Sequence, residues 1–370
     1  MKIAYITLHW PRIRQSGIGQ KIQTQLAAWQ KMGHEAHLFM HLIINDSEEP
    51  LVPAEYFYYP QKTGVLGRLN TEISRIQAFK SLIQQVNLYK PDLIYLRWGM
   101  YVFPIQQLKD IAPVVVEINT NDFYEHRLLG FTLDMYNRLT RTITLGNSTG
   151  LVCATRELAT AKEFTRFNKS TKVVSNGIDL SHIRPLPPPS NSIPRLIFIG
   201  TPDLAWHGVE KLITLAQHYP DINIDIVGYK TISGIEDMPD NIKFYGYLLK
   251  NEYRNVIAHS DLAIGTLSLY ENKMNEAAPL KIRDCLAHGL PVILPYIDTD
   301  LNELTSDVIL KIPNTPDNIE THGQAIHDFA YRMRGRRVSM ALIAPLIDAR
   351  EKEKQRLKFF QDMLDGKHSD

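Results

Sequence analysis

The feature that most constrains the fold is an alternation of short apolar segments with amphipathic segments, which runs along most of the chain. Residues 2–8 form an apolar, β-branched run typical of a buried strand. The next segment has apolar residues at steps of three and four, namely Ile18, Ile22, Leu26, Trp29 and Met32. This spacing places them on one face of a helix. Strands that alternate with helices predict a parallel sheet covered on both faces.

The same alternation predicts the other main elements. In the first half we expect strands at residues 36–40, 93–96, 114–118, 151–153 and 172–174, with helices at 71–88 and 124–145. In the second half we expect strands at residues 195–199, 222–227, 242–245, 262–264 and 291–294, with helices at 208–218, 252–258 and 281–288. A long charged helix is expected over residues 339–364. The predicted fold class is therefore α/β, with two doubly wound, Rossmann-like domains.

A proline-rich segment separates the two runs of alternation. Residues 183–194 contain five prolines in twelve positions. Proline fixes its own φ and disfavours helix in the residue before it, so this segment is predicted to be a connector. At 370 residues the chain is also longer than one hydrophobic core usually serves. We predict a first domain over residues 1–180, a second over 181–338 and a C-terminal helix over 339–370.

Composition excludes several classes of protein. The formal net charge is +1, so no global electrostatic attraction to nucleic acid is expected, and no nucleic-acid partner is predicted. Apolar runs are far shorter than the roughly 20 residues that cross a bilayer. Two cysteines, Cys153 and Cys285, cannot form a disulfide framework. A soluble, cytoplasmic protein is expected.

Ligands of open α/β sheets bind beyond the carboxyl ends of the strands, so the segment after residue 8 is the first candidate site. Gly17 and Gly19 allow close backbone approach, and the helix behind them offers free N–H groups to an anion. A tight strand-to-helix turn explains the same glycines equally well, because no dinucleotide-binding fingerprint follows them.

The segment from residue 275 to 292, NEAAPLKIRDCLAHGLPV, is more informative. Glu276 precedes a predicted helix, and Asp284 lies within it with seven residues between the two acids. Lys281 and Arg283 place cations beside them. Carboxylates suit sugar hydroxyls, while cations and helix N–H groups suit phosphate, so the segment fits a phosphorylated sugar. An ordinary solvated helix face is the alternative.

This segment resembles the donor-site motif of retaining glycosyltransferases of family four, which have the two-domain GT-B fold. In that motif two glutamates separated by seven residues precede a small-residue helix, a glycine and Pro-Val. Further segments resemble the family in the same order: the glycines at 17 and 19, residues 33–35 (GHE), 91–94 (PDLI), 172–179 (KVVSNGID), 198–200 (FIG) and 206–209 (WHGV). The resemblance implies two Rossmann-like domains that face a central cleft, with the last helix returning to brace the first domain.

The resemblance also implies a function, namely transfer of a hexosyl-type sugar from a nucleotide diphosphate sugar to an acceptor hydroxyl with retention at the anomeric carbon. The first domain would bind the acceptor and the second the UDP- or GDP-linked donor. No obligate cofactor and no metal ion are expected. Cell-surface polysaccharide or glycolipid assembly is the implied setting, with a glycan or lipid-linked acceptor and peripheral contact with the inner face of the membrane.

Site roles follow residue by residue from the same resemblance. Glu276 would contact the donor sugar and Asp284 the ribose. The predicted catalytic residues are Glu276 and Asn119; Asn119 stands where the family often has histidine. The predicted donor-binding residues are Asp284, Lys281, Leu280, Thr201, His207, Gly200 and Arg283, and the predicted acceptor or phosphate loop contains Gly17 and Gly19.

The chain departs from the family pattern at three donor-site positions. Asp284 replaces a glutamate, and Thr201 and His207 stand where the family often has arginine and lysine. Lys281 and Arg283 are the cations that would compensate for this loss. Two alternatives therefore stay open, a non-catalytic or weakly active protein that binds a nucleotide sugar, and a nucleotide-sugar epimerase.

Overall fold

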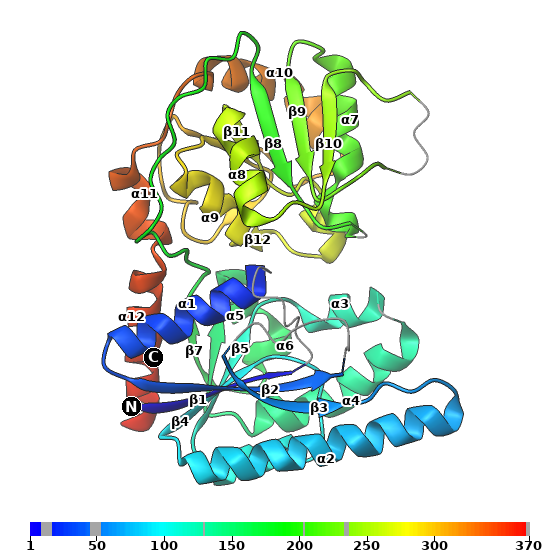
Figure 1. Cartoon of the computed structure of the whole chain (residues 1–370), viewed down its shortest axis with the longest axis vertical. Coiled ribbons are helices and arrows are strands. Elements are labelled where there is room, and N and C mark those ends of the chain that lie inside the picture. The colour runs from blue at the N-terminus through cyan, green and yellow to red at the C-terminus, as the bar shows by residue number, and fades with distance from the viewer. Residues whose placement is uncertain (9–16, 45–52, 129, 203, 233–236, 368–370) are drawn as a thin grey trace. The chain divides into compact units, whose positions relative to one another are not determined.

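The computed structural model describes residues 1–8, 17–44, 53–128, 130–202, 204–232 and 237–367. The chain forms two compact units (Figure 1). Unit 1 consists of Met1–Ser175 together with Lys352–Asp370, and unit 2 of Asn176–Glu351. Unit 1 is thus built from both ends of the chain, with unit 2 inserted between them.

Unit 1 contains a seven-stranded sheet in which all neighbouring strands are parallel, in the order β3-β2-β1-β4-β5-β6-β7. The strands are β1 Lys2–Leu8, β2 Glu35–Ile43, β3 Glu55–Tyr59, β4 Leu93–Arg97, β5 Val114–Ile118, β6 Gly150–Cys153 and β7 Ser170–Val173. Its helices are α1 Gly17–Lys31, α2 Val65–Tyr89, the 3-10 helix η1 Ile105–Asp110, α3 Asp122–Leu128, α4 Phe131–Gly146, α5 Arg156–Thr160 and α6 Lys162–Thr165, with most of α12 Ala349–Leu364. The order is that of a doubly wound fold.

Helices cover both faces of this sheet, α1 on one and α2 on the other (Figure 1). The rings of Tyr5 on β1, Trp29 on α1, Tyr95 on β4 and Phe360 on α12 pack together with centroids 5.0–5.8 Å apart. All four are fully buried. Helix α12 therefore completes the core of unit 1, as the fold class predicted.

Unit 2 contains a six-stranded parallel sheet in the order β10-β9-β8-β11-β13-β15 and a separate two-stranded sheet, β12-β14. The strands are β8 Arg195–Ile199, β9 Asn223–Val227, β10 Ile242–Gly246, β11 Leu262–Ile264, β12 Glu276–Ala277, β13 Val292–Leu294, β14 Ile297–Asp298 and β15 Ile309–Lys311. The helices are η2 Ala205–His207, α7 Val209–His218, α8 Lys250–His259, η3 Leu269–Asn272, α9 Leu280–Ala287, α10 Asn318–Met333 and α11 Met340–Ile347. The larger sheet repeats the strand order of the unit 1 sheet, which confirms two Rossmann-like domains.

The single helix predicted over residues 339–364 is wrong, because the structure has two helices, α11 and α12, that break at Asp348. The backbone of Ile178 pairs with this point: the Ile178 N–H donates to the carbonyl of Ile347 and its carbonyl accepts from Ala349 N–H. These bonds hold Asp348 in an extended conformation (φ −65°, ψ 121°) that ends the first helix.

One other predicted helix needs correction, and several elements were missed. The helix predicted over 124–145 is two helices, α3 and α4, and Gly130 precedes the second with φ 117°. Strands β3, β12, β14 and β15 and helices α5, α6 and α10 were not predicted. The proline-rich segment 183–194 lies within unit 2, and the chain passes from unit 1 to unit 2 between Ser175 and Asn176.

Candidate functional site

The loop that follows β8 lies where ligands of this fold bind. Strand β8 is flanked by β9 on one side and β11 on the other, so the winding of the sheet reverses there. Gly200 begins the loop. A Cβ on Gly200 would lie 2.6 Å from ring atoms of Phe198 and Tyr229 and 3.0 Å from His207 Nδ1. Glycine is therefore required here by packing within the protein.

Four of the predicted donor-site residues converge at this loop: Gly200, Thr201, His207 and Lys281. The backbone N–H of Thr201 donates to His207 Nδ1 over 3.2 Å, and Lys281 Nζ on α9 lies 3.3 Å from His207 Nε2. Tyr229, which the sequence analysis missed, places its hydroxyl 2.9 Å from His207 Nδ1 and donates to the Thr201 carbonyl over 2.6 Å. In the sequence, the only signal for Tyr229 was the preceding Gly228 at the end of β9.

Electrostatics at this cluster make His207 a neutral ring. Burial, followed by the charge of Lys281, lowers the pKa of His207 to about 3. Burial also lowers the pKa of Lys281 to about 7, and its Nζ lies 4.8 Å from the centroid of the Phe198 ring. A lysine with a pKa near 7 gains charge readily when an anion comes close.

The two acids of the motif lie in different surroundings. Glu276 is 5% exposed on β12, which pairs in parallel with β14. Asp284 is 6% exposed within α9, and Tyr253 on α8 donates its hydroxyl to Asp284 Oδ2 over 2.7 Å. Tyr253 was not predicted, and α8 carries no sequence signal that singles it out.

Arg283 lies in the interior rather than among the phosphate-binding groups that the sequence predicted. Its guanidinium is 0% exposed, forms a buried ion pair with Asp298 and donates to Asp300 over 2.7 Å. Its Nε donates to the carbonyl of Asn176 over 3.3 Å, and the Asn176 amide donates to the carbonyl of Ala278. The predicted compensation of the lost cations by Arg283 is therefore wrong, because its charge is used inside the protein.

Asp298 and Asp300 also form an Asp-x-Asp pattern, which was overlooked when no metal ion was expected. Such a pair often suggests a metal site. Here both carboxylates accept from Arg283, so their role is to hold the 276–283 segment through that residue. Within the described ranges, no three acids, histidines or cysteines gather as metal ligands do.

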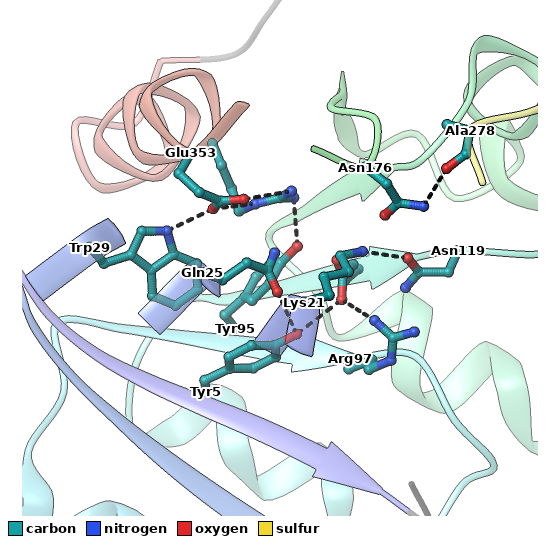
Figure 2. A network of polar contacts seen from close by, with 12 residues as sticks. Tyr5, Lys21, Gln25, Trp29, Tyr95, Arg97, Asn119, Asn176, Ala278 and Glu353 are labelled. Carbon is teal, nitrogen blue, oxygen red and sulfur yellow. Dashed lines mark hydrogen bonds and ion pairs between the residues drawn. The ribbon is translucent and has the colours of Figure 1, made fainter. Parts of the chain in front are cut away.

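In unit 1, Asn119 follows β5 at the carboxyl edge of the sheet and meets helix α1. Lys21 Nζ donates to Asn119 Oδ1 over 2.8 Å (Figure 2). The same Nζ forms an ion pair of 2.7 Å with Glu117. Arg97 on β4 donates to the other oxygen of Glu117 over 2.9 Å. The Tyr5 hydroxyl lies 3.2 Å from the same oxygen. Asn119 is thus positioned by a buried cluster of charges.

The pKa values in this cluster follow from burial and from opposite charge. Burial opposes ionisation of Glu117, but Lys21 and Arg97 outweigh it and hold its pKa well below the usual range. Burial lowers the pKa of Lys21 to about 8, and Glu117 offsets part of this effect. Sequence reasoning missed Lys21 and Glu117, although a glutamate within the apolar run of β5 was a visible signal.

Gly17 and Gly19 do not form the predicted loop. Both belong to the first turn of α1, which begins at Gly17. The part of the predicted loop before them, residues 9–16, lies outside the described residues. Lys21 follows on the same helix, and its side chain joins α1 to Asn119.

Comparisons with known proteins agree with this architecture. No family model and no curated protein matches the sequence. Solved structures do match: a sucrose-phosphate synthase from Thermosynechococcus elongatus has 13% identity and a TM-score of 0.69, with 99% of each chain covered. The lipopolysaccharide outer core galactosyltransferase WaaB has 11% identity and a TM-score of 0.65, with 99% of each chain covered. An alpha-glucosyltransferase in complex with UDP and DNA has 11% identity and a TM-score of 0.61, with 98% of this chain and 100% of that chain covered. The chain therefore has the GT-B fold.

Proposed function

We propose that this protein is a glycosyltransferase that moves a sugar from a nucleotide diphosphate sugar to an acceptor hydroxyl. The observation that carries the proposal is the convergence of Lys281, His207 and Thr201 at the loop after β8. That loop is where this fold binds phosphorylated ligands. Two solved structures of the same fold support it, since one is described as a galactosyltransferase and the other as a glucosyltransferase with bound UDP.

In this proposal unit 2 binds the donor. Lys281 and the N–H groups near Leu280 face the diphosphate, Glu276 contacts the hydroxyls of the sugar, and Asp284 with Tyr253 holds the ribose. The acceptor binds unit 1 near Asn119. The acceptor oxygen forms a bond to the anomeric carbon, the bond from that carbon to the phosphate oxygen breaks, and the departing phosphate takes the acceptor proton. Reaction on one face of the sugar gives retention.

A donor panel tests the proposal. We expect the full-length protein to hydrolyse or transfer sugar from at least one UDP- or GDP-linked hexose, and the Glu276→Ala variant to lose 100-fold or more of that turnover. Nuclear magnetic resonance of the first-formed product assigns the anomer, and an inverted anomer contradicts retention. Undiminished turnover by Glu276→Ala removes this residue from the mechanism.

One observation favours the alternative of a non-catalytic nucleotide-sugar-binding protein. His207 is neutral and Arg283 is used internally, so of these three residues only Lys281 supplies a cation to the loop. Calorimetry with UDP and GDP distinguishes the two functions, because binding without turnover of any donor supports the binding protein. An epimerase would convert the donor sugar with no acceptor present.

We propose a membrane-associated glycan or lipid-linked acceptor, met on the cytoplasmic side. Among the described residues, no helix has the length and apolar character needed to cross a bilayer. Peripheral contact is supported by apolar side chains on α2 that face solvent: Val65 is 86%, Leu66 78% and Leu69 58% exposed. Phe131 and Leu139 on α4 are 79% and 69% exposed. Such side chains insert into the interface of a membrane.

Vesicle sedimentation tests this contact. We expect the protein to sediment with vesicles that contain anionic lipid, and the double variant Leu66→Glu, Leu69→Glu to remain in the supernatant. Leu88→Glu is the matched control, since Leu88 is 69% exposed at the other end of α2. Equal sedimentation of the double variant and the control excludes this surface as the membrane contact.

Acceptor trials should include a DNA duplex, because one solved structure of this fold holds DNA.

A further inference from the structure

Lys281 lies in unusual surroundings for a lysine at a protein surface. Its Nζ contacts the neutral nitrogen of His207 on η2 and the ring of Phe198 on β8. On its own helix Lys281 interacts electrostatically with the thiol of Cys285, which is protonated because burial raises its pKa. No ion pair between Lys281 and a carboxylate occurs among the residues that the structure describes.

Three carboxylates in the same part of unit 2 have other partners. Asp284 accepts from Tyr253 and lies 3.5 Å from His288 Nδ1. Asp298 and Asp300 accept from Arg283. Lys281 therefore has no counter-ion from this set, and an incoming anion would be the first opposite charge placed against it.

His207 determines where the Lys281 amine lies. One edge of the ring is held by the Thr201 N–H and the Tyr229 hydroxyl, both on Nδ1. Tyr229 is held in turn by its bond to the Thr201 carbonyl. This arrangement directs Nε2 toward Lys281 Nζ. Because Nδ1 accepts from the Thr201 N–H, the neutral ring carries its proton on Nε2 and donates it to the uncharged amine of Lys281, so His207 is a positioning residue.

We propose that His207 positions Lys281 as the diphosphate-binding cation of the loop, and that binding of a nucleoside diphosphate is accompanied by uptake of a proton at this lysine. The inference rests on the proposed donor site and adds a dependence on pH to it. The Lys281 amine loses part of its charge near neutral pH because it is partly buried, beside an uncharged His207 ring and the Phe198 ring, with no carboxylate paired to it. The diphosphate supplies that counter-ion, and the amine takes one proton from solvent. No covalent bond changes.

The sign of the effect follows from linkage. A site that must be protonated to bind loses affinity as the pH rises above the pKa of the free form, by up to about tenfold per pH unit. The free pKa of Lys281 is about 7, so the loss begins just above neutral pH. The nucleotide phosphate itself is fully ionised above about pH 7, so it adds no slope in this range.

Calorimetry of UDP and GDP binding to the full chain at pH 7, 8 and 9, in two buffers of different ionisation enthalpy, tests the inference. We expect the wild-type Kd to rise between three- and tenfold per pH unit, with up to one proton taken up. Lys281→Arg keeps its charge and should bind with a flat pH profile. Lys273→Arg is the control and should keep the wild-type slope, because Lys273 is an exposed lysine of the same unit.

His207→Leu tests the positioning role. Without the Nε2–H donor the uncharged amine of Lys281 is less stable, so we expect the affinity to begin falling at a higher pH than in the wild type. A role for His207 in packing alone would weaken binding at every pH without moving the profile. If that variant does not fold, Lys281→Arg still decides the question.

The outcomes separate the inference from the proposed function. Failure of both nucleotides to bind at any pH contradicts the proposed function itself. Tight binding with a flat wild-type profile overturns the inference and leaves the donor site in place. If Lys281→Arg keeps the wild-type dependence of affinity on pH, the proton belongs to another group. That result also overturns the inference.

Discussion

The indole N–H of Trp29 on α1 donates to the carboxylate of Glu353 on α12 over 2.8 Å, across 324 positions of sequence. Both side chains are buried, and Arg356 completes the site through a 2.9 Å bond to the same carboxylate oxygen. This relationship attaches the last helix to the first and closes the core of unit 1.

Replacement of Trp29 by Phe removes that donor and leaves a buried carboxylate oxygen with one partner fewer. We expect the free energy of unfolding to fall by about 1–3 kcal/mol, as measured by urea denaturation. Tyr331→Phe is the control, because its bond to Asp221 is exposed, and it should change stability by less than about 0.5 kcal/mol. Equal effects of the two variants would mean that the Trp29–Glu353 bond contributes little.

Replacement of Arg283 by Met leaves Asp298 buried without its cation. Removal of one partner from a buried ion pair typically costs about 3–5 kcal/mol. We expect the free energy of unfolding, measured by urea denaturation, to fall by that amount. Nucleotide binding should also be lost, because the 276–283 segment is no longer held in place. Arg336→Met is the matched control, since its pair with Asp307 is 3.9 Å long and exposed on both sides. A Met variant that matches the control contradicts the structural role given to Arg283.

Glu117 predicts how stability responds to acid. Its pKa is lower in the folded protein than in the unfolded chain, because Lys21 and Arg97 outweigh the effect of burial. Its contribution is therefore complete above the unfolded pKa of about 4.5 and is lost as the pH falls below it. We expect Glu117→Gln to be about 3 kcal/mol less stable at pH 7 and to lose less stability than the wild type between pH 5 and pH 3. Parallel stability curves would contradict this assignment.

Gly228 predicts the effect of a side chain at the end of β9. Its φ is +101°, and an added Cβ would lie 2.0 Å from the carbonyl oxygen of Gly200. Gly33 has a φ of +84° but nothing within 4 Å of such a Cβ, so Gly33→Ala measures backbone strain alone, about 1–2 kcal/mol. We expect Gly228→Ala to lose at least twice as much in thermal or urea denaturation. Similar losses would show that the loop after β8 moves aside easily.

Most of the fold could be predicted from sequence because buried parallel strands are short apolar runs and the helices between them are amphipathic. Strand β3, EYFYY, was missed because it is not such an apolar run. It lies at the edge of its sheet, and only Tyr59 in it is fully buried. The break at Asp348 could not be predicted either, since its cause is pairing with Ile178, distant in sequence.

The candidate site was predicted in part. The motif residues Thr201, His207 and Lys281 do come together, because strand ends and helix starts bring them to one edge of the sheet. The internal ion pairing of Arg283 could not be predicted. Its position in the helix does not reveal that its side chain packs against Asp298 and Asp300. Tyr229 and Tyr253 were missed because a hydroxyl that bonds a buried partner leaves no periodic pattern.

The insertion of unit 2 between the two parts of unit 1 has a consequence for synthesis of the protein. A ribosome completes residues 1–175 before unit 2, yet the helix that packs on Trp29 and Tyr95 is translated after unit 2. Unit 2 is contiguous and can fold while translation continues. Of the two units, the one begun first is therefore finished second, and until α12 emerges its aromatic core is exposed to chaperones and proteases.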